Sequence, residues 1–157
     1  MENVSGRIVA VCRSAAKGER KKSIPVGELV VEHGLANDGH AGPGHRQISL
    51  LAQESIDKMC AAGLDVHAGD FAENITTRGI ELPVLPIGTR LALGDKAVVE
   101  VTQIGKECHQ RCAIYHQAGD CVMPREGIFA RVVVGGAIRA GDRVAPIADP
   151  VSVDRSA

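Results

Sequence analysis

The fold is decided by the stretch GTRLALGDKAVVEVTQI, residues 88–104. From Ala97 to Ile104, apolar residues alternate with Glu100 and Thr102, which is the pattern of a strand with one buried face. A shorter apolar segment at 89–93 precedes this strand, and Gly94-Asp95 lies between the two. A Gly-Asp pair between two strands is typical of a hairpin turn. The stretch therefore predicts an antiparallel β-hairpin.

A weaker copy of this pattern occurs at residues 136–142, where a short apolar segment is followed by Gly141-Asp142. Many short strands joined by Gly-rich turns in one small domain favour a closed barrel, which leaves no exposed sheet edge. We therefore expect a mostly β fold, a closed β-barrel with a few short helices. It should form a single domain at 1–148, followed by a tail at 149–157. Further strands are expected at 6–12, 26–32 and 71–77.

One clear helix is expected, at residues 47–62. Small and apolar residues recur there at three- and four-residue spacing, namely Ile48, Leu51, Ala52, Ser55, Ile56 and Met59. Gly63 follows directly and is expected to end the helix as its C-terminal cap.

Composition narrows the class of protein. The net charge is −1 and aromatic residues make up 2% of the chain, so neither a nucleic-acid partner nor a base-stacking surface is expected. No apolar run reaches the roughly 20 residues that cross a bilayer, so no membrane partner is expected. The chain has five cysteines and no signal-peptide pattern. The missing signal peptide predicts a cytoplasmic location, and an odd cysteine count in that reducing compartment argues against a disulfide framework.

The segment most suited to chemistry is GKECHQRC at 105–112, directly after the 97–104 strand. Lys106, His109 and Arg111 surround Cys108, and nearby positive charge lowers the pKa of a thiol. A thiolate is both a nucleophile and a soft metal ligand. We therefore expect Cys108, with His109 and Arg111, to form the catalytic group.

The other cysteines allow alternatives. Cys12 and Cys60 fall on apolar faces and are expected to be small buried packing residues. Cys108 could form a structural zinc site with Cys112, Cys121 and either His109 or His116, because these are metal-ligand types. Their spacing matches neither a zinc knuckle nor a common iron–sulfur motif.

Two polar segments could support a site. His33, His40 and His45 lie in a Gly-rich loop with Asp38 and Arg46, and such a loop can form an anion-binding surface. In the second segment, DFAENIT at 70–76, the polar residues Glu73, Asn74 and Thr76 could be simple outward positions on a strand.

Taken together, these segments resemble the MOSC family, named for the C-terminal domain of molybdenum-cofactor sulfurases. The resemblance depends on an ordered set of pieces: GLANDGHAG at 34–42, HRQISLL at 45–51, DFAENIT at 70–76, LPIGT at 85–89, VTQ at 101–103 leading to Cys108, Gly135-Gly136 and Gly141-Asp142. It implies the MOSC type of β-barrel and a signature cysteine at Cys108 that carries sulfur or binds molybdenum.

The resemblance also implies a molybdenum–pterin cofactor, whose anionic phosphate needs basic and polar partners. The implied cofactor-binding residues are Lys17, Lys22, Ser23, His40, Arg46 and Asn74. The large sulfurases carry a pyridoxal-phosphate domain for which this chain has no room, so no pyridoxal phosphate is expected. The implied partner is the cofactor or a sulfur donor such as a cysteine desulfurase. Cys112 and Cys121 would resolve a persulfide or hold a metal. A non-catalytic cofactor carrier and a metal-stapled structural module remain the alternative functions.

Overall fold

The structure is a computed structural model that describes residues 5–16, 20–39, 41–105 and 126–147. Its strands are β1 (Gly6–Arg13), β2 (Lys22–Ile24), β3 (Gly27–Val30), β4 (Gly34–Leu35), β5 (Ile48–Ala52), β6 (Ile75–Arg78), β7 (Arg90–Leu93), β8 (Ala97–Ile104), β9 (Ile128–Val134), β10 (Gly136–Ile138) and β11 (Arg143–Pro146). The helix α1 (Gln53–Ala61) and a 3-10 turn at Leu82–Val84 complete the described elements. Within these residues, no helix combines the length and the apolar character needed to cross a membrane.

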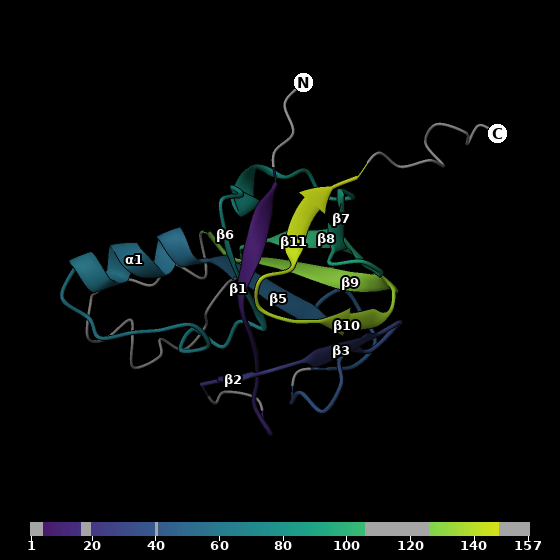
Figure 1. Cartoon of the computed structure of the whole chain (residues 1–157), viewed down its shortest axis with the longest axis horizontal. Helices are drawn as coiled ribbons and strands as arrows, with labels where there is room; N and C mark the ends of the chain where they lie inside the picture. Colours follow the sequence, from purple (N-terminus) through teal and green to yellow (C-terminus); the bar gives the residue numbers. More distant parts are fainter. Residues whose placement is uncertain (1–4, 17–19, 40, 106–125, 148–157) are drawn as a thin grey trace.

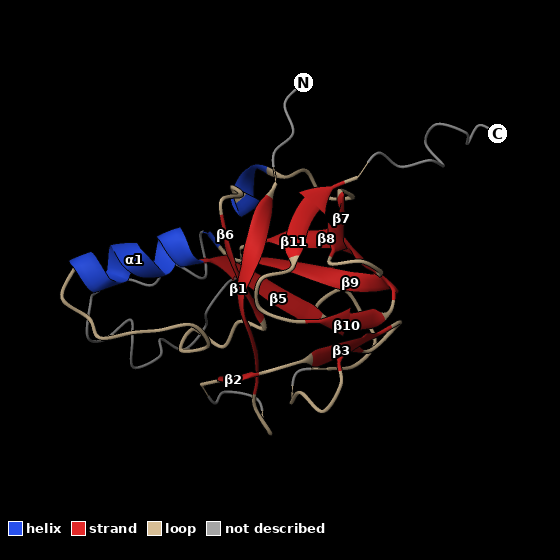
Figure 2. Ribbon diagram, in the orientation of Figure 1, coloured by secondary structure: helices blue, strands red, loops and turns tan. Residues whose placement is uncertain are grey.

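Seven strands close into a barrel. Hydrogen bonds connect them in the order β11-β7-β8-β9-β5-β6-β1, and β1 pairs again with β11 to complete the ring. Strand β2 extends this sheet from β1, while β10, β3 and β4 form a separate sheet below it (Figures 1 and 2). The mostly β, closed-barrel fold expected from the sequence is therefore confirmed.

The predicted hairpin is also confirmed. Strands β7 and β8 pair antiparallel, with Leu91 opposite Val99 and Leu93 opposite Ala97. The turn between them contains Gly94 at φ +67°, a conformation that glycine adopts without steric cost. The second Gly-Asp pair connects β10 to β11, which belong to different sheets.

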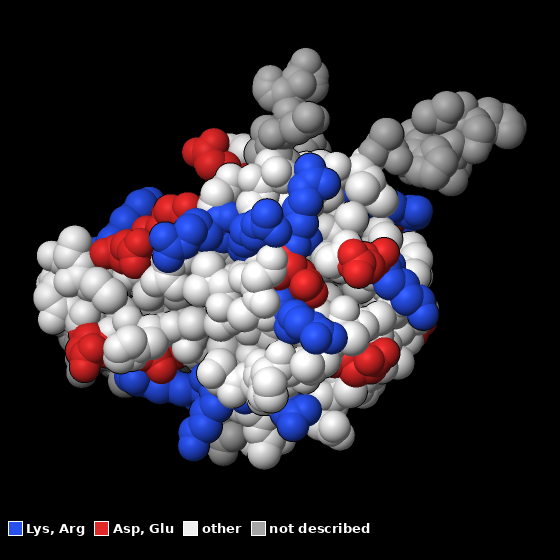
Figure 3. Space-filling view, in the orientation of Figure 1, with Lys and Arg blue, Asp and Glu red and all other residues white. Residues whose placement is uncertain are grey.

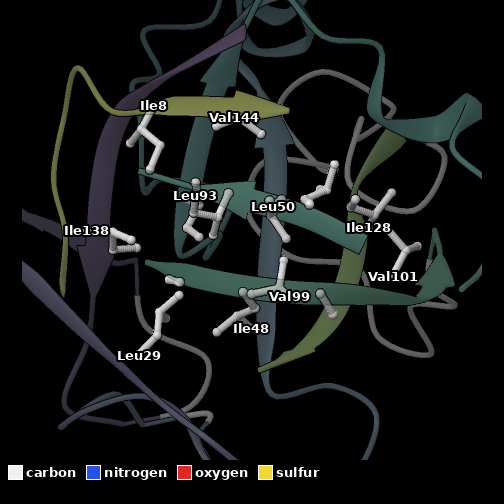
Figure 4. Close-up of a cluster of buried hydrophobic side chains, with 14 of the residues drawn as sticks. Ile8, Leu29, Ile48, Leu50, Leu93, Val99, Val101, Ile128, Ile138 and Val144 are labelled. Carbon is white, nitrogen blue, oxygen red and sulfur yellow. The ribbon is translucent and has the colours of Figure 1, made fainter. Parts of the chain in front are cut away.

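Branched apolar side chains fill the barrel. Leu50, Val99 and Ile128 point into its interior from three strands and are fully buried (Figure 4). Each such side chain contributes about 1.5–3 kcal/mol when it leaves water. The alternation read from 97–104 is accurate, because Ala97, Val99 and Val101 are buried and Val98, Glu100 and Thr102 are only partly so.

The helix predicted at 47–62 is wrong in its first third. Residues Ile48–Ala52 form strand β5, and the helix begins only at Gln53. All five β5 residues are buried, because the strand has the barrel interior on one face and α1 on the other. A strand buried on both faces has no polar alternation and resembles a buried helix. The C-cap is confirmed, since Gly63 has φ +102° and donates its N–H to Cys60 O.

The strand expected at 71–77 begins later, at Ile75. The interpretation of Glu73, Asn74 and Thr76 as outward positions is wrong, because each is at most 1% exposed. The outer face of this part of the barrel is covered by a second apolar cluster: Leu51, Ile56, Met59, Val66, Phe71 and Phe129. Polar side chains placed beneath such a cover must find internal hydrogen bonds.

Candidate functional site

Strands β8 and β9 bracket the predicted cysteine segment. The last residue pair of the two strands is Ile104 opposite Ile128, and the N–H of Gly105 donates to the carbonyl of Gly127 at 2.6 Å. Gly105 and Gly127, which lie on either side of the predicted cysteine segment in the sequence, are therefore neighbours in the structure. The predicted residues Cys108, His109, Arg111, Cys112 and Cys121 lie outside the described residues, as do Lys17 and His40, so their roles stay predictions.

Arg46 lies at this same end of β8 and β9. Its guanidinium carbon stacks 4.9 Å from the ring centre of Phe129, and its Nε donates to Gln103 Oε1 at 2.9 Å. Gln103 Nε2 in turn donates to the carbonyl of Gly105 at 2.8 Å. Stacking and hydrogen bonding fix the Arg46 side chain while leaving it exposed, so a fixed positive charge stands where β8 leads toward Cys108.

His45 shares the same acceptor. Its Nε2 lies 3.0 Å from Gln103 Oε1, and an amide oxygen can only accept a hydrogen bond. The His45 Nε2 therefore carries a proton in this pairing. The sequence grouped His45 and Arg46 as part of an anion-binding loop, and the structure brings these two residues together on one glutamine.

A separate cationic pocket of about 420 Å³ lies where β1 ends. Its described lining residues are Arg13, Ser14, Ala15, Arg20, Lys22, Ile24 and Asn37, which include three cationic side chains and no carboxylate. Arg13 stands opposite Lys22 in the β1–β2 register. Figure 3 shows a group of Lys and Arg side chains along the lower edge of the molecule, near β2.

The pocket contains only part of the predicted phosphate site. Lys22 lines it, but Ser23 and Arg46 do not. Arg13, Arg20 and Asn37 were missed from the sequence. Arg13 could have been found, because it directly follows the strand expected at 6–12 and is a basic residue close to the basic run that contains Lys22.

Asn74 holds strands together. Its Oδ1 accepts from the N–H of Ser49 at 3.0 Å, and its Nδ2 donates to the carbonyl of Cys12 at 3.2 Å. These bonds join the ends of β1, β5 and β6 in the buried interior. Contact between Asn74 and a ligand stays a prediction.

A buried ion pair is hydrogen-bonded to the pocket residue Ser14. Lys21 Nζ donates to Asp38 Oδ1 at 2.8 Å and to Ser14 Oγ at 3.2 Å, and neither charged side chain is exposed. Burial would raise the pKa of Asp38, but hydrogen bonds from Lys21, Ser14 and Asn74 outweigh it and lower the pKa below its ordinary value. Since Lys21 precedes Lys22 and Asp38 follows Asn37, the pair fixes two walls of the pocket.

Glu73 lies near the same interior. Its Oε2 accepts from the N–H of Gly69 at 2.8 Å and from Thr76 Oγ1 at 2.6 Å, while Oε1 has no partner among the described residues. Burial raises the pKa of Glu73, against the opposing effect of these hydrogen bonds. The Glu73 carboxylate also raises the pKa of the Cys12 thiol.

Cys12 should resist alkylation in the folded protein at neutral pH. Burial, followed by the nearby carboxylates of Glu73 and Asp70, raises its pKa to about 12. Cys60 provides an internal comparison, because the structure shows it exposed, which corrects the expectation of a buried packing residue. Peptide mapping after iodoacetamide treatment should find Cys60 labelled and Cys12 labelled only after unfolding. Equal labelling of both in the native state would contradict this arrangement.

Within the described ranges, no three His, Cys, Asp or Glu side chains are grouped to hold a metal ion. The proposed trio of Cys108, Cys112 and Cys121 falls outside those ranges.

Comparison with known proteins gives a family match. The model of the MOSC domain family matches residues 37–145. A search of curated proteins finds no match. The matched region includes Asp38, Arg46, Gln103 and Cys108.

Solved structures share the fold. The YuaD protein from Bacillus subtilis is 16% identical with a TM-score of 0.76, and the match covers 92% of this chain and 97% of that one. YiiM from Geobacillus stearothermophilus is 20% identical with a TM-score of 0.63, covering 92% and 74%. YiiM from Escherichia coli is 19% identical with a TM-score of 0.63, covering 91% and 70%.

Proposed function

This chain belongs to the MOSC domain family, and from this premise we propose that it handles sulfur or the molybdenum–pterin cofactor through Cys108. The family is associated with molybdenum-cofactor sulfurase-like function. The observation that carries the proposal is the cationic pocket of Arg13, Arg20 and Lys22. It offers positive charge and hydrogen-bond donors to an anion.

The pocket residues fit the phosphate of such a cofactor. Two arginines present forked donors that suit phosphate oxygens, and Lys22 adds a point charge. Ser14 and Asn37 line the same space, and none of the lining residues that the structure describes carries negative charge. Arg13, Arg20 and Lys22 would therefore hold the phosphate end of the cofactor.

Arg46 and Cys108 would serve the reacting end. Arg46 is fixed at the end of β8 that leads into the cysteine segment. When bound, the cofactor would supply a molybdenum centre suited to a soft thiolate ligand. For sulfur transfer, the Cys108 thiolate would attack the terminal sulfur of a donor persulfide. A new S–S bond would form on Cys108, and the donor would leave as a thiolate without net oxidation.

The proposal is tested by analysing the purified protein for molybdenum, for pterin, and for a mass gain of one sulfur atom after incubation with a cysteine desulfurase and cysteine. Either a bound cofactor or a sulfur adduct on the Cys108 peptide is expected. Binding without turnover would mark the chain as a carrier. Absence of cofactor binding and of sulfur loading would contradict the proposal.

Charge reversal in either cationic region should weaken cofactor binding. Lys22→Glu and Arg46→Glu are each expected to cost about 1–3 kcal/mol of binding free energy, since each removes a charge-assisted contact to an anion. The measurement is the pterin retained by each purified variant across a dilution series. Lys96→Glu makes the same charge change in the exposed turn after β7 and should retain the wild-type amount. Unchanged retention in both test variants would refute the assigned anion contacts.

A further inference from the structure

Three arginines form a row across neighbouring strands at the opposite end of β1. Arg7 on β1 stands opposite Arg78 on β6 and opposite Arg143 on β11, and all three are exposed. We call these three residues the arginine row. Figure 3 shows Lys and Arg side chains gathered across the upper half of this face, over β6, β1 and β11. Neighbouring strands lie about 4.8 Å apart, so the row is about 10 Å long.

The described part of the chain supplies no ion-pair partner for the row. Within the part of the chain that the structure describes, none of the three arginines forms an ion pair, although Arg7 Nη1 donates to the carbonyl of Gly141 at 3.2 Å. Two carboxylates of the same region bond to backbone instead. Glu54 accepts from the N–H of Gly79, and Asp142 accepts from the N–H of Arg139. Like charges directly opposite each other on paired strands are destabilising, so the row costs the free protein stability.

We propose that the arginine row is a docking surface for an acidic face of another protein. Its planar guanidinium groups match carboxylates in a two-bond geometry. Nucleic acid is a poorer fit: the net charge is −1, and both phenylalanines of this aromatic-poor chain are buried. A row of three charges also matches a short acidic patch better than the continuous charge of a phosphate backbone.

The row lies at the other end of β1 from the cationic pocket. Arg7 is near the start of the strand and Arg13 is its last residue, which places them about 20 Å apart along the chain. An acidic protein bound to the row would leave the pocket open. The proposal therefore does not depend on what the pocket or Cys108 binds.

The binding test uses a labelled polyglutamate peptide at low ionic strength, followed by fluorescence anisotropy. The double variant R7Q/R143Q should bind about tenfold more weakly than the wild type, because two ion pairs are lost. The matched control K58Q/K96Q removes the same charge elsewhere on the surface and should stay within about twofold of the wild type. Equal loss in both doubles, or no loss in R7Q/R143Q, would overturn the proposal. So would tighter arginine-dependent binding of a duplex DNA of similar length.

A stability measurement separates a docking role from a structural one. Among the described residues Arg143 forms no ion pair, and it faces Arg7, so R143Q should raise the thermal midpoint by about 2 °C at low salt, and less at high salt. A lower midpoint in R143Q would show that the row stabilises the barrel, and the docking proposal would fail.

Discussion

Replacing Asp38 with alanine should destabilise the protein by about 3–5 kcal/mol, the usual cost of removing one partner from a buried ion pair. The Lys21 ammonium would lose the carboxylate that it bonds at 2.8 Å while remaining inside the protein. The loss would appear as a lower free energy of unfolding in urea. Asp95→Ala, in the exposed turn after β7, removes the same charge and should stay within about 0.5 kcal/mol of the wild type.

The same pair predicts a dependence on acid. The pKa of Asp38 is lower in the folded protein than in the unfolded chain, so its contribution is complete above the unfolded pKa of about 4. That contribution disappears as the pH falls through the folded pKa. The wild type should therefore lose more stability than Asp38→Ala between about pH 5 and pH 2. Parallel pH profiles for the two proteins would contradict this role of Asp38.

A double replacement tests whether the buried Lys21–Asp38 pair also positions the pocket residues. Lys21→Met with Asp38→Leu exchanges two buried charges for apolar groups and should recover much of the stability lost in Asp38→Ala. The hydrogen bonds to Ser14 would still be missing, and these hold the β1 end of the pocket in place. A well-folded double variant with weakened cofactor retention is the expected outcome.

The barrel could be predicted from the sequence because strands such as β8 are buried on one face only. Strand β8 alternates along its length, and the turn before it contains Gly94. These are local signals, and the predicted bounds of β8 match the observed ones. Strand β5 could not be predicted in the same way. Its burial on both faces depends on α1 and β9, which a local pattern does not reveal.

The site was predictable only in part for a similar reason. Lys22 was found because it belongs to a basic run in the sequence, while its position opposite Arg13 follows only from the β1–β2 register. Nothing in the local sequence around Lys21 predicts that its side chain is buried. A lysine is rarely buried unless paired, and its partner Asp38 is 17 residues away in the sequence.

Cys108→Ser should abolish function while leaving the barrel intact. Cys108 lies three residues after Gly105, which is hydrogen-bonded to Gly127 at the end of the β8–β9 pair, and five residues after Gln103, which accepts a hydrogen bond from Arg46. Lys106, His109 and Arg111 add positive charge in the sequence, which favours the thiolate form needed for transfer or ligation. Cys112→Ser is the matched control, because it makes the same chemical change four residues away.

The decisive comparison is the amount of sulfane sulfur and molybdenum bound per chain in wild type, Cys108→Ser and Cys112→Ser, loaded side by side and checked for folding by circular dichroism. The wild type should load sulfur, molybdenum or both. Cys112→Ser should keep most of that load, and folded Cys108→Ser should lose it. A folded Cys108→Ser protein that retains the full load would show that the chemistry does not depend on Cys108.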